Sequence, residues 1–155
     1  MKVKDLMTSK IRTCFVSDNL ATAAQLMWEY DCGCVPVLNE HAQVVGMLTD
    51  RDVCMAVFFQ GASMSEIRVS GVMSKHLFVC ASDDELSAAA ATMCEKKVRR
   101  LPVLDEQARL VGLLSLSDFA ARADSENAQG VVKRTVTDSQ VARLAAAVSG
   151  PRKAE

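Results

Sequence analysis

Residues 46–52 read Gly-Met-Leu-Thr-Asp-Arg-Asp, and residues 112–118 read Gly-Leu-Leu-Ser-Leu-Ser-Asp. The offset of 66 residues holds without a gap from residue 3 to residue 123, and 18 of the 55 aligned pairs are identical. Ordinary residue frequencies would give roughly three or four matches by chance. The period is too long for a solenoid repeat, so we expect two copies of one small domain that pair about a pseudo-two-fold axis.

The composition is that of an ordinary globular chain. It has 155 residues, of which 50% are hydrophobic and 24% charged, and its formal net charge is −1. One copy alone would bury too little surface to be very stable, so we expect both copies to fold as one body. The charge offers no field that would attract nucleic acid or an anionic membrane. The N-terminus lacks the apolar run of a signal peptide, and no apolar stretch is long enough to span a bilayer. We therefore expect a soluble cytoplasmic protein.

Both copies show the same order of predicted elements, β-α-β-β-α, which is an α+β fold. Apolar residues at i, i+3, i+4 and i+7 from Leu20 and from Leu86 predict one helix with a buried face in each copy. Asp18 and Asp83 or Asp84 stand where the N-caps of these helices belong. The first copy is expected to have a strand at 11–16, a helix that ends near 29, a hairpin of strands 35–38 and 44–48, and a helix at 50–59. The second copy is expected to have a strand at 77–80, a helix ending near 95, an equivalent hairpin and a helix at 116–123.

The chain divides by this reading into four parts. Residues 1–61 and 69–123 hold the two repeats, residues 62–68 link them, and residues 124–155 form a C-terminal tail. Within the tail we expect a polar loop over 124–130, a strand within 131–137 and a last helix over 140–149. Thr137 or Ser139 would cap that helix, and its small side chains predict that it is weakly docked.

A Thr-or-Ser-x-x-Asp pattern opens the last helix of each repeat. Thr49 and Asp52 form it in the first copy, and Ser115 and Asp118 form it in the second. A helix N-terminus exposes unpaired N–H groups and partial positive charge, which suits a phosphate. A carboxylate one turn into the helix can accept the two hydrogen bonds that a ribose diol offers. An ordinary capping box gives the same pattern, but its recurrence at equivalent positions favours a binding role.

Together, the β-α-β-β-α order, the Leu/Val-Pro-Val-Leu strand and the Gly-x-x-Thr/Ser-x-x-Asp ending resemble the CBS domain, named after cystathionine β-synthase. Two such domains in tandem resemble a Bateman module, and the resemblance covers residues 3–123. It implies a regulatory protein in signal transduction that binds an adenosyl ligand between the repeats. AMP or ATP is the expected ligand, with ADP, NAD or S-adenosylmethionine as alternatives. The resemblance also implies a homodimer and a regulated partner protein.

Carried over by position, the resemblance assigns three kinds of contact. Asp52 and Asp118 would hold the two riboses, and Thr49 and Ser115 would contact phosphate or sugar. Backbone and side chains of the first strand in each repeat, and the facing proline strand, would enclose the adenine. The residues expected at the two adenine pockets are Ile11, Thr13, Val35 and Pro36 in the first copy and Leu77, Val79, Leu101 and Pro102 in the second.

Positive charge is placed differently in the two copies. Arg51 lies inside the first motif, where the second copy has Ser117. Arg99 and Arg100 precede the proline strand of the second copy, and Lys75 and His76 precede its first strand. An Arg side chain suits phosphate because its planar fork binds two oxygens at once. We expect unequal sites, with the second slightly favoured for its density of cations.

Six cysteines and two aromatic residues stand apart from these motifs. Cys14 and Cys80 are repeat-equivalent and flanked by strand-forming residues, so we expect buried thiols. Cys32 and Cys34 form a Cys-x-Cys, which lacks the usual spacing of a zinc or redox motif. Trp28 and Tyr30 end the first helix and have no aromatic counterparts in the second copy. They belong either to the core or to a dimer contact, and we expect the core.

Two other classes of protein remain open. One is a ligand-free dimeric scaffold whose tail docks a partner, and the other is a redox or metal sensor that uses Cys32 and Cys34. No catalytic arrangement is repeated in both copies and no phosphate-binding glycine loop is present. We therefore expect binding without turnover, and no metal site.

Overall fold

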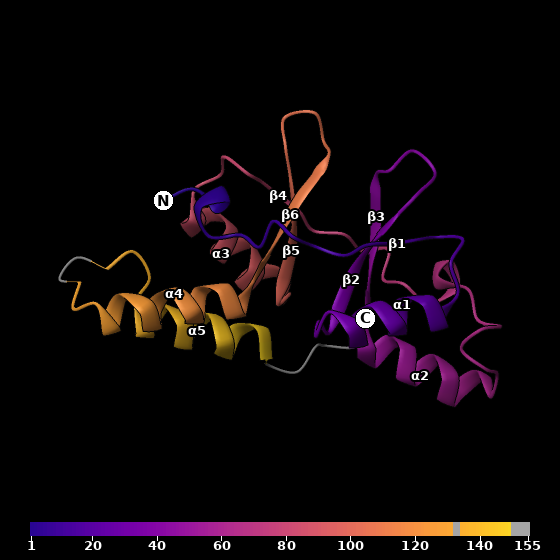
Figure 1. The fold of residues 1–155 in the computed structure, drawn as a ribbon. Coiled ribbons are helices and arrows are strands. Elements are labelled where there is room, and N and C mark those ends of the chain that lie inside the picture. The colour runs from indigo at the N-terminus through magenta and orange to yellow at the C-terminus, as the bar shows by residue number, and fades with distance from the viewer. Residues whose placement is uncertain (132–133, 150–155) are drawn as a thin grey trace. The chain divides into compact units, whose positions relative to one another are not determined.

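The structure is a computed structural model that describes residues 1–131 and 134–149 (Figure 1). By its internal contacts the chain forms two compact units, one of residues 10–77 and one that joins residues 1–9 to the described chain from residue 78 onward. Each unit holds a three-stranded sheet with helices packed against it. The predicted α+β class and the repeated β-α-β-β-α order are confirmed.

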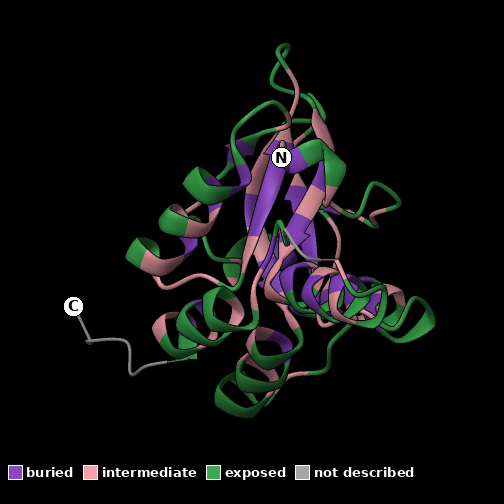
Figure 2. Ribbon diagram, turned by 90° about the vertical axis from the view of Figure 1, so that its left-hand side faces the viewer, coloured by how far each residue is buried: buried purple, intermediate pink, exposed green. Residues whose placement is uncertain are grey.

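The unit of residues 10–77 contains the first copy of the repeat. The central strand β2 pairs parallel with β1 and antiparallel with β3. Its elements are β1 (Cys14–Phe15), α1 (Leu20–Glu29), β2 (Cys34–Leu38), β3 (Val44–Thr49), α2 (Asp50–Gln60) and the short 3-10 helix η2 (Val69–Gly71). Buried residues of β1, α1, β2, β3, α2 and η2 form its core. Figure 2 colours the ribbon of buried residues purple.

The other unit repeats this arrangement and adds a helix. Strand β5 again pairs parallel with one neighbour, β4, and antiparallel with the other, β6. The elements are η1 (Val3–Asp5), β4 (Cys80–Ala81), α3 (Leu86–Lys96), β5 (Arg100–Leu104), β6 (Leu110–Ser115), α4 (Leu116–Ala128) and α5 (Asp138–Ser149). Helix α5 packs on both α3 and α4.

The segment before the first strand of each repeat completes the sheet of the other repeat. Thr8 forms a β-bridge with Leu113 on β6, and Ser74 forms the equivalent bridge with Met47 on β3. Both bridges lie beside a glycine. A Cβ on Gly46 would lie 2.7 Å from the Ser74 carbonyl oxygen, and one on Gly112 would lie 3.0 Å from the Thr8 carbonyl oxygen. Glycine is therefore required here by the close approach of the two backbones.

The first helix of each repeat is not capped by the predicted residue. Asn19, rather than Asp18, is the N-cap of α1, and its Oδ1 accepts a hydrogen bond of 3.0 Å from the Thr22 N–H. Glu85 precedes α3 and makes no side-chain cap. Asp18 and Asp84 each accept a hydrogen bond of 2.8 Å from the N–H three residues earlier, and so stabilise the turn after β1 or β4. The strands before these turns have two residues each, shorter than expected.

The described part of the C-terminal tail contains more helix than the sequence predicted. Helix α4 continues to Ala128, so the loop expected from residue 124 is wrong. Residue 131 and residues 134–137 contain no strand, and residues 132–133 lie outside the described part. Thr137 caps the last helix as one of the two expected candidates, because its Oγ1 accepts from the Gln140 N–H at 3.3 Å. Gly150 and Pro151, which follow this helix in the sequence and would end it, lie outside the described residues.

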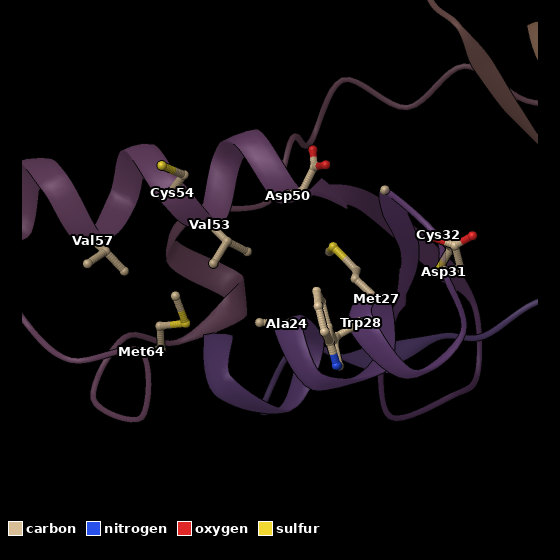
Figure 3. Close-up of a pocket in the computed structure, with 11 residues that line it drawn as sticks. Ala24, Met27, Trp28, Asp31, Cys32, Asp50, Val53, Cys54, Val57 and Met64 are labelled. Atoms are coloured by element: carbon tan, nitrogen blue, oxygen red, sulfur yellow. The ribbon is translucent and has the colours of Figure 1, made fainter.

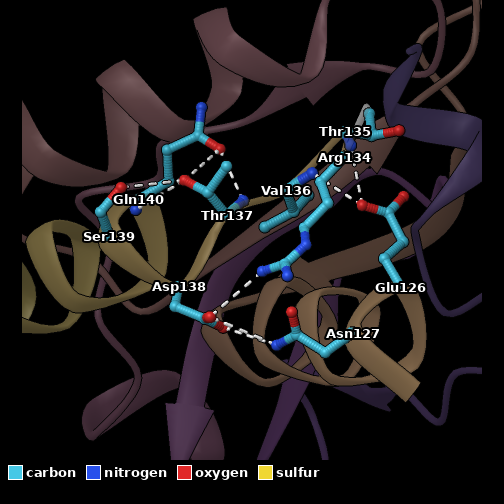
Figure 4. Close-up of polar contacts among 9 residues, drawn as sticks. All are labelled: Glu126, Asn127, Arg134, Thr135, Val136, Thr137, Asp138, Ser139 and Gln140. Carbon is cyan, nitrogen blue, oxygen red and sulfur yellow. Dashed lines mark hydrogen bonds and ion pairs between the residues drawn. The ribbon is translucent and has the colours of Figure 1, made fainter. Parts of the chain in front are cut away.

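Helix α5 is firmly docked, which corrects the prediction of a loose helix. Leu144 and Val148 are buried in the same core as residues of α3 and α4. The segment leading to α5 is held by Glu126 of α4, whose carboxylate accepts hydrogen bonds from the N–H groups of Thr135 and Val136 (Figure 4). Burial alone would raise the pKa of Glu126, but hydrogen bonds from Arg122 and from these two N–H groups lower it to about 2.

The aromatic residues at the end of α1 are not in the core. Trp28 is 88% exposed and Tyr30 is 47% exposed, so that prediction is wrong. The Arg12 guanidinium lies 3.8 Å from the centre of the Tyr30 ring, which holds Tyr30 at the surface. Among the helices of the described chain, none is both long and apolar enough to cross a membrane.

Candidate functional site

The first Thr-x-x-Asp motif lies where β3 passes directly into α2. Thr49 ends the strand in an extended conformation and is the N-cap of the helix. Its Oγ1 donates to Asp52 Oδ2 at 2.7 Å, and its N–H donates to the same oxygen at 2.9 Å. The Asp52 N–H in turn donates to Thr49 Oγ1 at 3.2 Å. This reciprocal capping box fixes the carboxylate of Asp52 at the start of α2.

The second motif repeats this geometry where β6 passes into α4. The hydroxyl and the N–H of Ser115 donate to Asp118 Oδ2 at 2.6 and 2.7 Å. The Asp118 N–H points back to Ser115 Oγ at 3.4 Å. Both motifs are thus capping boxes, and in each of them one carboxylate oxygen is engaged within the box.

The second oxygen of each carboxylate distinguishes the two motifs. Asp118 Oδ1 accepts a hydrogen bond of 3.2 Å from the Thr8 hydroxyl. In the described residues, Asp52 Oδ1 accepts no hydrogen bond, although Ser74 occupies the position equivalent to Thr8. Thr8 was not among the predicted site residues. The only signal for it in the sequence is that the repeat alignment pairs one hydroxyl side chain with another.

Asp52 also borders a concave surface. A cavity of about 310 Å³ is lined by Asp52 together with residues of α2 and of the segment around η2, namely Met55, Ala56, Phe59, Gln60, Gly71 and Val72. The free oxygen of Asp52 and this cavity lie in the same unit of the chain. The first motif therefore borders this cavity.

The residues expected around the adenine differ in how far they are buried. Val35, Pro36, Leu101 and Pro102 lie on the central strands β2 and β5 and are buried in the cores. Ile11, Thr13 and Leu77 are half-buried, and Val79 is 39% exposed. Leu77 belongs to the unit of residues 10–77, whereas Val79 and Leu101 belong to the other unit. Their role at one adenine pocket remains a prediction.

The candidate phosphate-binding cations are likewise distributed over both units. Arg51 is exposed in the first turn of α2, and Lys75 and His76 are exposed in the same unit. Arg100 begins β5 and pairs in register with Ser115, which places a cation beside the second motif. Arg99 donates to Ser149 Oγ on α5 at 3.3 Å, a contact that the sequence did not indicate.

The cysteines differ in how far they are buried. Cys14 and Cys80 are buried as predicted, and burial raises the pKa of Cys14 to about 12 and of Cys80 to about 11. Both thiols are therefore protonated at neutral pH. Cys34 begins β2 and is buried, while Cys32 is half-buried. The described residues contain no group of three or more His, Cys, Asp or Glu side chains that could hold a metal ion.

Comparison with known proteins identifies both repeats. The model of a family described as "CBS domain" matches residues 3–58 and 69–124. The CBS domain-containing protein YhcV of Bacillus subtilis is 33% identical over 139 residues, which cover 90% of this chain and 97% of YhcV. The solved structure of Hypoxic Response Protein I with two coordinated zinc ions is 27% identical, with a TM-score of 0.70, over 78% of this chain and 98% of that one. The structure of CBSX2 in complex with AMP has a TM-score of 0.68 at 24% identity, over 81% of this chain and 98% of that one.

Proposed function

The chain belongs to the CBS-domain family, and we propose that it is a regulatory protein that binds an adenosyl ligand and thereby modulates a partner protein. AMP or ATP is the proposed ligand, with ADP, NAD and S-adenosylmethionine as alternatives. The single observation that carries this proposal is the pair of Thr/Ser-x-x-Asp capping boxes at equivalent strand-to-helix junctions. The solved AMP complex of CBSX2, a protein of the same fold, supports this choice of ligand.

The chemistry of each motif fits a nucleoside phosphate. The capping box holds the carboxylate still, so binding a diol costs little side-chain ordering. A ribose diol would donate to the carboxylate, and a phosphate would accept from the N-terminal N–H groups of α2 or α4. Two arginines are candidates for the phosphate contact. Arg51 lies within the first motif in sequence, and Arg100 pairs in register with Ser115 of the second motif.

Binding without turnover is the proposed mode of action. A ligand that prefers one arrangement of the repeats would shift the population toward that arrangement, by no more than its difference in affinity. A partner that distinguishes the two arrangements would then respond to the ligand. The proposed assembly contains two copies of the chain.

The test is isothermal titration calorimetry with AMP and with ATP on the intact protein and on Asp52→Ala and Asp118→Ala. Loss of a charged hydrogen-bonding partner costs about 1.5–3 kcal/mol, so affinity should fall roughly 10- to 150-fold at the site affected. Asp50→Ala is the matched control. Asp50 is an exposed carboxylate one helical position after Thr49, and it lies outside the capping box. Affinities that stay unchanged in both test variants would refute the proposed site.

Each alanine variant also loses part of a capping box, worth about 0.5–2 kcal/mol of stability. Far-UV circular dichroism at the titration temperature shows whether the variant is folded. If the intact protein binds neither nucleotide nor any other adenosyl compound, the proposed function itself is wrong.

A further inference from the structure

The segment that leads into the first strand of each repeat is not part of the sheet. Residues 9–13 and 75–79 lie in no strand or helix, and β1 and β4 begin directly after them. These two segments contain four of the residues that are expected around the adenine. Because the ladder of sheet hydrogen bonds begins after the segments, side-chain contacts decide where they lie.

In the first repeat, a contact between a cation and an aromatic ring holds this segment. The guanidinium carbon of Arg12 lies 3.8 Å from the centre of the Tyr30 ring. Tyr30 is the C-cap of α1, and its N–H donates to the Leu26 carbonyl oxygen at 3.1 Å. The Cys32 N–H donates to the Met27 carbonyl oxygen at 3.0 Å, a bond that commonly closes a helix. Arg12 is therefore attached to a helix end that is itself fixed.

The second repeat contains the same contact with the two residue types exchanged. Phe78 is equivalent to Arg12, and Lys96 is equivalent to Tyr30. Lys96 Nζ lies 5.7 Å from the centre of the Phe78 ring, which is within the range of a cation–π interaction. The segment therefore supplies the cation in the first copy and the aromatic ring in the second, and the helix end supplies the other member.

This exchange indicates that the positions require the contact rather than either residue. Energetically significant cation–π pairs occur about once per 70–80 residues, so a chain of 155 residues would hold about two at unrelated positions. Here both of the pairs found among the described residues lie at equivalent positions of the two repeats. Neither position keeps its residue type, but the pair is kept.

The contact in the first repeat is separate from the cavity beside α1. Trp28 and Asp31, on either side of Tyr30 in the sequence, line the cavity between α1 and α2 (Figure 3). Tyr30 instead contacts the segment that precedes β1. Its role is therefore to be sought in that segment.

We propose that Arg12 and Tyr30 are positioning residues for ligand binding, because their contact fixes the segment that is expected to face the adenine. This inference rests on the proposed function. Arg12 stands between Ile11 and Thr13, so its contact with Tyr30 fixes both of these neighbours relative to α1. A pocket wall that is already fixed costs the ligand less ordering on binding.

The first repeat is the better place to test this role. The Arg12 contact is shorter than the Lys96 contact, and a planar guanidinium stacks on a ring in a way that an ammonium does not. Lys96 Nζ also forms an ion pair of 2.6 Å with Glu95 Oε1. Breaking the contact should therefore have the larger effect in the first repeat.

The test breaks the contact and then restores it with the residues of the second repeat. Tyr30→Leu removes the ring without a change of charge. The double variant Arg12→Phe with Tyr30→Lys rebuilds the pair with the residue types of Phe78 and Lys96 and keeps the net charge. Tyr30 is exposed, and the double variant uses residue types that the chain already holds at equivalent positions, so both proteins should fold.

Phe15→Leu is the matched control. Phe15 is 45% exposed and Tyr30 is 47% exposed, and both belong to the unit of residues 10–77. Each variant replaces an exposed ring by leucine, but only one of them removes the contact with Arg12. The control should behave like the intact protein in both measurements.

The first measurement is the backbone ¹⁵N order parameter of residues 11–13 without ligand. We expect values near 0.85, as in rigid backbone, for the intact protein and the double variant, and lower values for Tyr30→Leu. The second measurement is isothermal titration calorimetry with AMP and with ATP. Loss of an exposed cation–π contact should weaken binding roughly 2- to 5-fold in Tyr30→Leu, and the double variant should recover the affinity of the intact protein.

Each other outcome has a definite meaning. Order parameters that Tyr30→Leu leaves unchanged would overturn the proposal, whether or not a nucleotide binds. Lower order with unchanged affinity would overturn the role in binding and leave the proposed function standing. A loss of affinity that the double variant does not recover would show that Tyr30 does not act through Arg12. If the intact protein binds no nucleotide, the proposed function is wrong and this role is wrong with it.

Discussion

Replacing Leu144 by alanine should measurably destabilise the protein, because α5 is part of a core. Leu144 is 3% exposed and shares that core with residues of α3, α4 and β5. Truncation of a buried leucine to alanine costs about 2–5 kcal/mol, depending on how far the cavity collapses. At about 3 kcal/mol, the melting temperature of a chain of this size should fall by roughly 6–12 °C.

The measurement is urea or thermal unfolding followed by far-UV circular dichroism. Arg143→Ala is the matched control, since Arg143 is the preceding residue on the same helix and is exposed. It should change the free energy of unfolding by less than about 0.5 kcal/mol. If Leu144→Ala costs no more than the control, α5 does not belong to the core.

Two further predictions concern titratable groups. Iodoacetamide at pH 8 should alkylate the exposed Cys54 but not Cys14 or Cys80. These two thiols are buried and their raised pKa values keep them protonated, so little reactive thiolate forms. Mass spectrometry of the native protein checks this, and equal labelling of all three would contradict it. The pKa of Glu126 is lowered from 4.5 to about 2, so its contribution to stability is full above about pH 4.5 and is lost as the pH falls toward 2. Thermal unfolding from pH 3 to 7 should show the deficit of Glu126→Gln shrinking with falling pH, and a constant deficit would contradict the assignment.

The repeats and their helices could be predicted because their signals are local. The capping boxes at Thr49 and Ser115 need only the hydroxyl and the carboxylate three residues later. Asp18 misled the prediction because an aspartate that closes a turn and one that caps a helix look alike in sequence. Asn19, one residue later, makes the cap instead.

Long-range features of the candidate site could not be predicted. The repeat alignment shows that Thr8 and Ser74 are equivalent, but it does not show that each completes the other repeat's sheet. The bond from Thr8 to Asp118 follows from that exchange. Asp118 Oδ1 already accepts a hydrogen bond from the Thr8 hydroxyl, whereas a ribose would need that oxygen. This observation argues against the expected preference for the second site.

The burial of α5 and of Trp28 also depends on tertiary contacts, which the sequence pattern does not show. The alanine-rich sequence of α5 predicts weak packing. In the structure its few large side chains, Leu144 and Val148, are both buried in the core. The sequence predicts Trp28 in the core because large aromatic residues are usually buried. The structure places it at the surface, 88% exposed, on the lining of a cavity between α1 and α2.

The most direct test of ligand binding is a thermal-shift panel with AMP, ADP, ATP, NAD, NADH and S-adenosylmethionine. A ligand that binds only the folded state adds about 2.7 kcal/mol at 100 times its dissociation constant, or roughly 5–11 °C for a chain of this size. We expect such a shift for at least one compound, and we expect Asp52→Ala or Asp118→Ala to reduce it to roughly half or less while Asp50→Ala preserves it. No shift with any of the six compounds would contradict the proposal that this protein is an adenosyl sensor.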